Sequence, residues 1–169
     1  MQHMVVLRGP IGAGKTSLMQ EVSRQLPNCS AVEIDALKRM ADPEASSAWR
    51  RDVALETGAF MTQKLLENGR SVVTETHARW REQTERFRNI SQRLSGVAFS
   101  SFLVYAPYDI CLERITKRSI PDITYAIDEA MISSYYVNLD PLSDEAAIDT
   151  SVVDPPAAVN FIINSIQNR

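Results

Sequence analysis

The segment Gly9-Pro-Ile-Gly-Ala-Gly-Lys-Thr16 constrains the fold of this chain more than any other feature. It fits the Walker A pattern GxxxxGK[ST] in full, with an apolar run, Met4 to Arg8, before it and a helix-compatible segment, Lys15 to Leu26, after it. In a strand, loop and helix of this kind, backbone N–H groups and the positive end of the helix dipole point at phosphate oxygens. The motif predicts a phosphate-binding P-loop, the alternative being a glycine-rich turn with a solvated lysine.

Short apolar segments typical of strands alternate along the chain with segments of helical spacing. The unbroken apolar run Phe102 to Tyr105 suits a strand that is covered on both faces. The alternation predicts an α/β fold, a five-stranded parallel sheet flanked by helices on both faces, with ligands at the carboxyl ends of the strands. The predicted strands are Met4–Arg8, Ser30–Ile34, Ser71–Thr74, Val97–Tyr105 and Ala146–Val153.

Several predicted helices have clear ends. A long helix from Trp49 stops at Asn68-Gly69, and its apolar positions recur at helical spacing: Val53, Phe60, Met61 and Leu65. The last helix begins at Asp154, a capping carboxylate followed by two prolines. Further helices are predicted around Phe87, around Ile110 and over about 125–136.

Length and composition fit one ordinary globular domain. The chain has 169 residues, 44% hydrophobic and 23% charged, and a domain typically has roughly 100–200 residues. We expect one P-loop kinase-like domain over 1–169, with an acceptor-binding region at about 36–70 and a lid at about 114–126. Cys29 and Cys111 lack metal-binding spacing and are expected to be packing residues.

Charge and hydropathy limit the partners. The 18 basic and 21 acidic residues give a net charge of -3, which disfavours nucleic acid as a partner of the whole molecule. No apolar run approaches the roughly 18 residues of a membrane span. We therefore expect a cytoplasmic protein that does not bind a membrane.

The P-loop residues predict the nucleotide site. Lys15 should reach the β- and γ-phosphates of ATP, and the Thr16 hydroxyl should ligate Mg²⁺. The residues predicted to bind nucleotide are Gly9, Gly12, Ala13, Gly14, Lys15, Thr16, Ser17, Arg114 and Arg118.

Polar residues at two other strand ends predict the rest of the chemistry. Asp35 follows the second strand as a candidate general base or Mg²⁺ ligand, with a helix N-cap as the alternative. Glu75 ends a strand that should neighbour the P-loop strand, where it could contact Mg²⁺. His77 extends this polar edge, although a lone histidine is most often structural or solvated.

Basic residues follow the strands as well. Arg114, Lys117 and Arg118 precede the break Ser119-Ile-Pro-Asp122 and could form a lid that stabilises the transferring phosphoryl group; Arg118 is nearest the break. The alternative is a basic helix end that complements the helix dipole.

Two further pairs of cations could bind the acceptor. Lys38 and Arg39 follow the second strand, and Arg79 and Arg81 flank Trp80 after the third. Arginine suits forked contacts with phosphate or carboxylate, but arginine is also common on surfaces, and Trp80 could serve packing alone.

These motifs together resemble P-loop kinase-like, AAA-type proteins that include polynucleotide 5′-hydroxyl kinases, zeta-toxin-type kinases and chloramphenicol phosphotransferase. The resemblance spans most of the chain and implies that Asp35 is the catalytic base and that Arg118 belongs to a lid over the donor phosphates. It also implies that the segment between Asp35 and Glu75 shapes the acceptor site, with Lys38 binding substrate. The chain departs from the frequent Asp-Asp-x-Arg form at Ala36 and Lys38. The matching segments are Gly9–Thr16, Ile34–Lys38, Val73–Thr76, Leu112–Arg118 and Ile148–Thr150.

Three functions follow as hypotheses. The first is an ATP-dependent kinase that transfers the γ-phosphoryl group to a hydroxyl of a small molecule, with Lys15, Asp35 and Arg118 as catalytic residues. The second keeps the reaction and changes the acceptor to a polynucleotide or nucleotide 5′-hydroxyl. The third is an ATP-dependent switch or binding module with slow hydrolysis, which a P-loop alone also allows.

Overall fold

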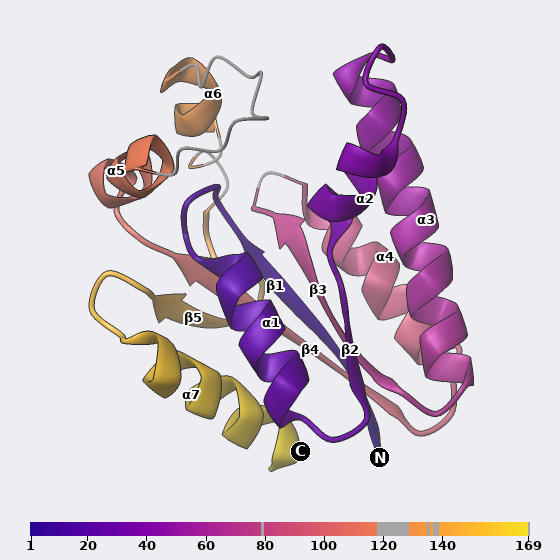
Figure 1. Ribbon diagram of the computed structural model, residues 1–169. Coiled ribbons are helices and arrows are strands. Elements are labelled where there is room, and N and C mark those ends of the chain that lie inside the picture. Colours follow the sequence, from indigo (N-terminus) through magenta and orange to yellow (C-terminus); the bar gives the residue numbers. More distant parts are fainter. Residues whose placement is uncertain (79, 118–128, 135, 137–138, 169) are drawn as a thin grey trace.

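A computed structural model describes residues 1–78, 80–117, 129–134, 136 and 139–168 of the chain (Figure 1). Five strands form one sheet in the order β2-β3-β1-β4-β5, and each strand is parallel to its neighbours. The predicted fold class is therefore confirmed. The strands are β1 Gln2–Gly9, β2 Cys29–Val32, β3 Ser71–His77, β4 Val97–Tyr105 and β5 Ala146–Asp149.

The helices begin and end close to the predicted signals. The Asp154 carboxylate accepts a hydrogen bond of 2.8 Å from the backbone N–H of Ala157 and so caps the last helix. Among the described residues, no helix is both long enough and apolar enough to cross a bilayer. The helices are α1 Lys15–Gln25, α2 Ile34–Met40, α3 Ser47–Glu67, α4 Arg81–Gln92, α5 Tyr108–Lys117, α6 Glu129–Ser134 and α7 Pro155–Gln167.

The apolar core has one layer on each face of the sheet, as Figure 1 lets the reader follow. Side chains alternate along β1, so Val5 and Leu7 pack with α1 and α7 on one face. Met4 and Val6 pack with α3 and α4 on the other. The central strand is thus buried on both sides, as the apolar sequence of its segment requires.

Three details of the sequence prediction are wrong. Strand β2 ends at Val32, and residues 34–40 form helix α2 instead of continuing the strand. Strand β5 ends at Asp149, because the chain turns there, with the backbone N–H groups of Val152 and Val153 donating to the Asp149 carbonyl at 3.3 and 2.9 Å.

The third concerns the packing of α3. Its large apolar residues Phe60 and Met61 are 63% and 41% exposed, and the buried face is made of small residues that include Ala54, Gly58 and Ala59. The reason is a close approach between helices, since a Cβ atom at Gly58 would lie 2.3 Å from Ile34 Cδ1 of α2. Helix α3 therefore holds α2 near the carboxyl edge of the sheet.

The strand order creates a crevice at the carboxyl ends of β1 and β3. These strands are neighbours, with Gly9 in register with His77. Strand β1 leads into α1 on one face, whereas β3 leads into α4 on the opposite face. Connections that depart to opposite faces leave an opening between them, which is where open α/β sheets bind ligands.

A fully buried ion pair lies under this crevice. Arg8 and Glu145 are both 0% exposed in their side chains, and Arg8 Nη2 lies 2.6 Å from Glu145 Oε2. The guanidinium also donates to the carbonyls of Ala78 at 3.0 Å and Asp140 at 2.7 Å. The backbone N–H of Leu142 donates to the same carboxylate at 3.0 Å. One side chain thus joins the end of β1, the turn after β3 and the segment before β5.

Breaking this pair should cost more stability than breaking any surface pair. We expect Glu145→Gln to lower the free energy of unfolding by about 3–5 kcal/mol, because Arg8 keeps a buried charge without its counter-charge. Replacing the exposed Glu21, which pairs with Arg24, by Gln should lower the free energy of unfolding far less, because solvent screens an exposed pair. Urea denaturation measures both, and equal losses would contradict the role assigned to the buried pair.

Candidate active site

The P-loop runs from the end of β1 into the first turn of α1, as predicted. Its close packing explains two of its glycines. A Cβ atom at Gly9 would lie 1.9 Å from the Val104 carbonyl oxygen, and one at Gly12 would lie 2.7 Å from the Cys111 carbonyl oxygen at a φ of +83°. Lys15 is only 8% exposed, and its Nζ donates to the Pro10 carbonyl at 2.8 Å, so the ammonium is held within the loop.

The hydroxyl of Thr16 and the carboxylate of Glu75 lie together beside this loop. Thr16 Oγ1 donates to Glu75 Oε2 at 2.9 Å. Glu75 is 5% exposed, and its other oxygen, Oε1, is buried with no hydrogen-bond partner among the residues that the structure describes. Burial raises the pKa of the Glu75 carboxyl, the Lys15 ammonium opposes this shift, and the charge of Asp35 adds to it.

This pair of oxygen groups fits a role beside Mg²⁺. A buried carboxylate oxygen without a partner costs free energy that a nearby cation would recover. The described residues contain no group of three or more His, Cys, Asp or Glu side chains that could enclose a metal by themselves. Mg²⁺ beside a nucleotide typically uses only one or two protein ligands together with phosphates and waters, so the donor set suits it.

Asp35 lies at this same edge but on a helix. It stands in the first turn of α2, and the cap position is Glu33, whose side chain makes no capping hydrogen bond. Asp35 is close enough to Glu75 and His77 for its negative charge to raise the pKa of both. The predicted base and the predicted Mg²⁺-linked acid therefore lie near one another at the carboxyl edge of the sheet.

His77 and Trp80 form the wall of the crevice next to Asp35. Their rings pack edge to face with centroids 5.2 Å apart. The pKa of the His77 imidazole is lowered to about 4, chiefly by burial and then by the positive charge of Lys15, so the ring is neutral at neutral pH. Lys38 and Arg51 also lower this pKa, and the Arg51 guanidinium lies 4.9 Å from the centroid of the Trp80 ring.

Arg114 supports the P-loop from behind. Its guanidinium donates to the carbonyl and to the hydroxyl of Thr150, at 2.7 and 2.9 Å, and to the Gly12 carbonyl at 3.4 Å. The Thr150 hydroxyl in turn donates to the Ala13 carbonyl at 2.9 Å. The predicted nucleotide-site residue Arg114 is thus bound to the loop backbone, and Thr150 joins it from the end of β5.

The structure describes some of the remaining predicted residues and not others. Arg118 and Arg79 lie outside the described residues, as does most of the predicted lid. Lys38 and Arg39 stand in the last turn of α2, where Arg39 pairs with Glu33 at 2.8 Å. Arg81 begins α4. Arg51 is not among the residues predicted from the sequence. Its place in the N-terminal turns of a helix beside the predicted acceptor region is the signal that could have indicated it.

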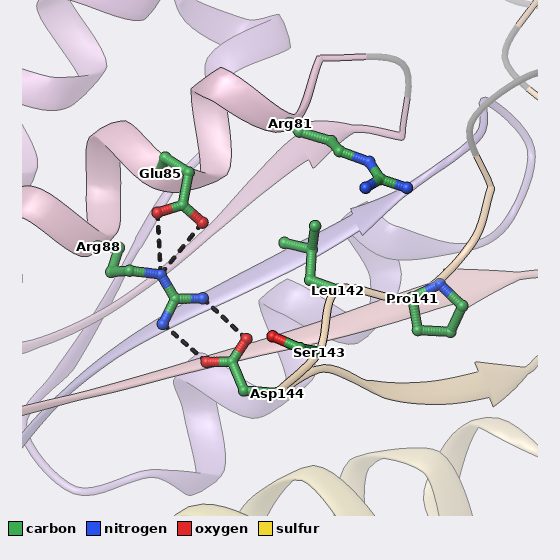
Figure 2. A pocket seen from close by; sticks show the side chains of 7 residues that line it. All are labelled: Arg81, Glu85, Arg88, Pro141, Leu142, Ser143 and Asp144. Atoms are coloured by element: carbon green, nitrogen blue, oxygen red, sulfur yellow. Dashed lines mark hydrogen bonds and ion pairs between the residues drawn. The ribbon is translucent and has the colours of Figure 1, made fainter.

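Two cavities flank the start of α4. The larger, about 600 Å³, lies between α4 and residues 141–144. Figure 2 shows Arg81 extending across it and Arg88 held between Glu85 and Asp144, at 3.1 and 2.7 Å. The smaller, about 230 Å³, is lined by residues of α3 and α4 that include Arg51 and Trp80. Trp80, which lines the second cavity, also packs against His77, the residue in register with Gly9 of the P-loop.

Comparison with known proteins gives a family and a fold. A family model described as an AAA domain matches residues 4–139. No curated protein matches the chain. A candidate kinase from Chloroflexus aurantiacus superposes with a TM-score of 0.77 at 22% identity, covering 99% of this chain and 98% of that one.

Two further solved structures have the same fold over nearly their whole length. A sugar kinase from Janibacter sp. has a TM-score of 0.69 at 19% identity, covering 99% of this chain and 95% of that one. A tunicamycin resistance protein from Deinococcus radiodurans has a TM-score of 0.68 at 16% identity, with 98% and 96% covered. At these identities the likeness extends to the fold alone.

The support of the P-loop by Arg114 and Thr150 leads to a prediction. Because both side chains belong to one network, Arg114→Ala and Thr150→Val should each raise the Kd for ATP. A charge-assisted hydrogen bond is worth about 1.5–3 kcal/mol, so the loss should be near tenfold or greater. The double variant should lose clearly less than the sum, as residues in one network do.

Isothermal titration calorimetry with ATP measures these constants. Thr116→Ala, which removes an exposed hydroxyl on the same helix α5, serves as the control and should leave the Kd unchanged. Strictly additive losses in the double variant would contradict the shared network.

Proposed function

The chain belongs to the AAA domain family of P-loop kinase-like proteins, and we propose from this premise that it is an ATP-dependent kinase acting on a hydroxyl of a small molecule. The observation that carries the proposal is the hydrogen bond of 2.9 Å between Thr16 and Glu75, with Asp35 close enough to raise the pKa of that glutamate. Phosphate-binding groups and an available acid thus meet at one edge. A kinase needs both.

The P-loop holds the donor in this account. Its backbone N–H groups and the start of α1 bind the phosphates, and Lys15 neutralises charge that develops on the β- and γ-phosphates. Thr16 and Glu75 would hold Mg²⁺, which would supply positive charge to offset the negative charge of the phosphates. Arg114 keeps the loop in shape through Gly12 and Thr150.

Asp35 accepts the proton in the transfer step. The acceptor hydroxyl oxygen forms a bond to the γ-phosphorus, the bond from that phosphorus to the bridging oxygen breaks, and ADP carries away the electron pair. The hydroxyl proton passes to the Asp35 carboxylate. Arg118, from the segment after α5, is proposed to neutralise the transferring group as part of a lid, and Lys38 to contact the acceptor.

The acceptor is proposed to be a small molecule. The net charge of -3 disfavours a polyanion, and the solved relatives include a sugar kinase. A cytoplasmic location fits the need for ATP. A polynucleotide kinase would instead put phosphate on an oligonucleotide 5′ end with a steep salt dependence of binding. A switch would hydrolyse ATP at a rate that no hydroxyl compound changes.

Asp35 provides the direct test of the base assignment. We expect Asp35→Asn to lower kcat for acceptor phosphorylation by about 10²–10⁴-fold, the usual contribution of a general base, while the Kd for ATP stays nearly the same. Coupled assay of ADP release and calorimetry with ATP measure the two effects.

The neighbouring acid Glu33 is the matched control, because it is two residues away and its carboxylate already pairs with Arg39 at 2.8 Å. Glu33→Gln should turn over at nearly the wild-type rate. Wild-type turnover by the Asp35→Asn variant would refute the assignment of the base.

A further inference from the structure

The cavity of about 230 Å³ between α3 and α4 is built from the N-terminal halves of both helices. In Figure 1 these helix ends lie at the carboxyl edge of the sheet, next to α2. Leu55 and the Trp80 ring give the cavity an apolar part, and Gln83 adds an amide that can both donate and accept. The cavity thus lies between helix ends at the same edge of the sheet as the P-loop.

A continuous set of contacts joins the cavity to the P-loop. Arg51 stacks on Trp80 at 4.9 Å, and Trp80 packs against His77 at 5.2 Å. His77 is in register with Gly9, and the backbone N–H of Ala78 donates to the Gly9 carbonyl at 3.1 Å. A molecule bound against Trp80 would therefore lie beside the residues that flank the donor phosphates.

The charges of the cavity are balanced. Arg51 Nη2 lies 3.0 Å from Asp52 Oδ1, and Arg86 makes two hydrogen bonds of 2.6 Å to Glu56. The residues that line the cavity thus include two guanidiniums, of Arg51 and Arg86, and two carboxylates, of Asp52 and Glu82. A site for a phosphorylated or polyanionic acceptor needs a net positive charge, and the described lining lacks one. Interleaved donors and acceptors around an aromatic ring suit a molecule that carries several uncharged hydroxyls.

The size of the cavity also suits a small ligand. Pockets that enclose drug-sized ligands have roughly 300–1,000 Å³, and this cavity is smaller at about 230 Å³. We propose that it is the acceptor site and that it binds a neutral polyhydroxylated ring of about the size of one monosaccharide, with Arg51 and Trp80 as the residues that select it. This proposal rests on the proposed kinase function.

The two tryptophans of the chain allow a direct test. Trp49 is 50% exposed, so Trp49→Phe should leave a folded protein in which Trp80 alone reports on the cavity. We would titrate this variant, without ATP, with D-glucose, D-ribose and myo-inositol, and in parallel with glucose 6-phosphate and an oligonucleotide that has a free 5′-hydroxyl. We expect a neutral polyol to change the Trp80 emission saturably. Both phosphorylated probes should change it less.

A substitution in the cavity completes the test. In the Trp49→Phe background, Arg51→Ala should raise the Kd for the responding polyol by about tenfold, through loss of a charged hydrogen-bond donor. The Kd for ATP should not change. Arg24→Ala removes an exposed arginine in the last turn of α1 that likewise pairs with a nearby acid, and it should leave both constants unchanged. Calorimetry repeats the measurement independently of the emission.

The outcomes separate the cavity from the kinase function. If no neutral polyol changes the Trp80 emission or gives heat, or if only the phosphorylated probes bind, the cavity proposal is overturned. Saturable polyol binding without phosphoryl transfer would support the cavity as a binding site and refute the proposed kinase function. Phosphoryl transfer to a polyol that does not change the Trp80 emission would support the kinase function and refute the cavity as the acceptor site.

Discussion

The parallel pairing of β1 with β3 is the constraint on which the rest of the site depends. It sets Gly9 opposite His77, and because the two strands lead to helices on opposite faces, the P-loop and the Trp80 wall approach the same crevice from two sides. The Arg8–Glu145 pair fixes this junction from below, since Arg8 also binds the carbonyl of Ala78 at the turn after β3. A buried charge in this position adds little stability of its own but makes other arrangements costly.

The groups around the crevice act on one another because they are buried together. Burial and the charge of Asp35 raise the pKa of Glu75, whereas burial and the charge of Lys15 lower the pKa of His77. The result is a site with a neutral imidazole beside two acids and a lysine ammonium. Such fixed charges and dipoles stabilise charge that develops in a transferring phosphoryl group without waiting for solvent to reorganise.

The sequence predicts what depends on local patterns. The Gly9–Thr16 motif, the parallel sheet and the Asp154 helix start follow from spacing and capping, and the expectation that the strand of Glu75 neighbours the P-loop strand is confirmed. The sequence misses what depends on distant packing. Arg8 and Glu145 are 137 residues apart, and the start of α2 at Ile34 packs closely against Gly58 of α3. An arginine at the end of a buried strand signals that an acid partner exists without indicating which one.

The central claim is that the two sides of the crevice bind the donor and the acceptor of one transfer reaction. Phosphorus NMR of the wild-type protein with ATP, Mg²⁺ and a mixture of neutral polyols tests it most directly. The account predicts a new phosphomonoester resonance that grows in step with ADP and is absent without the polyols. ADP accompanied only by inorganic phosphate, at a rate that the polyols do not change, would contradict it.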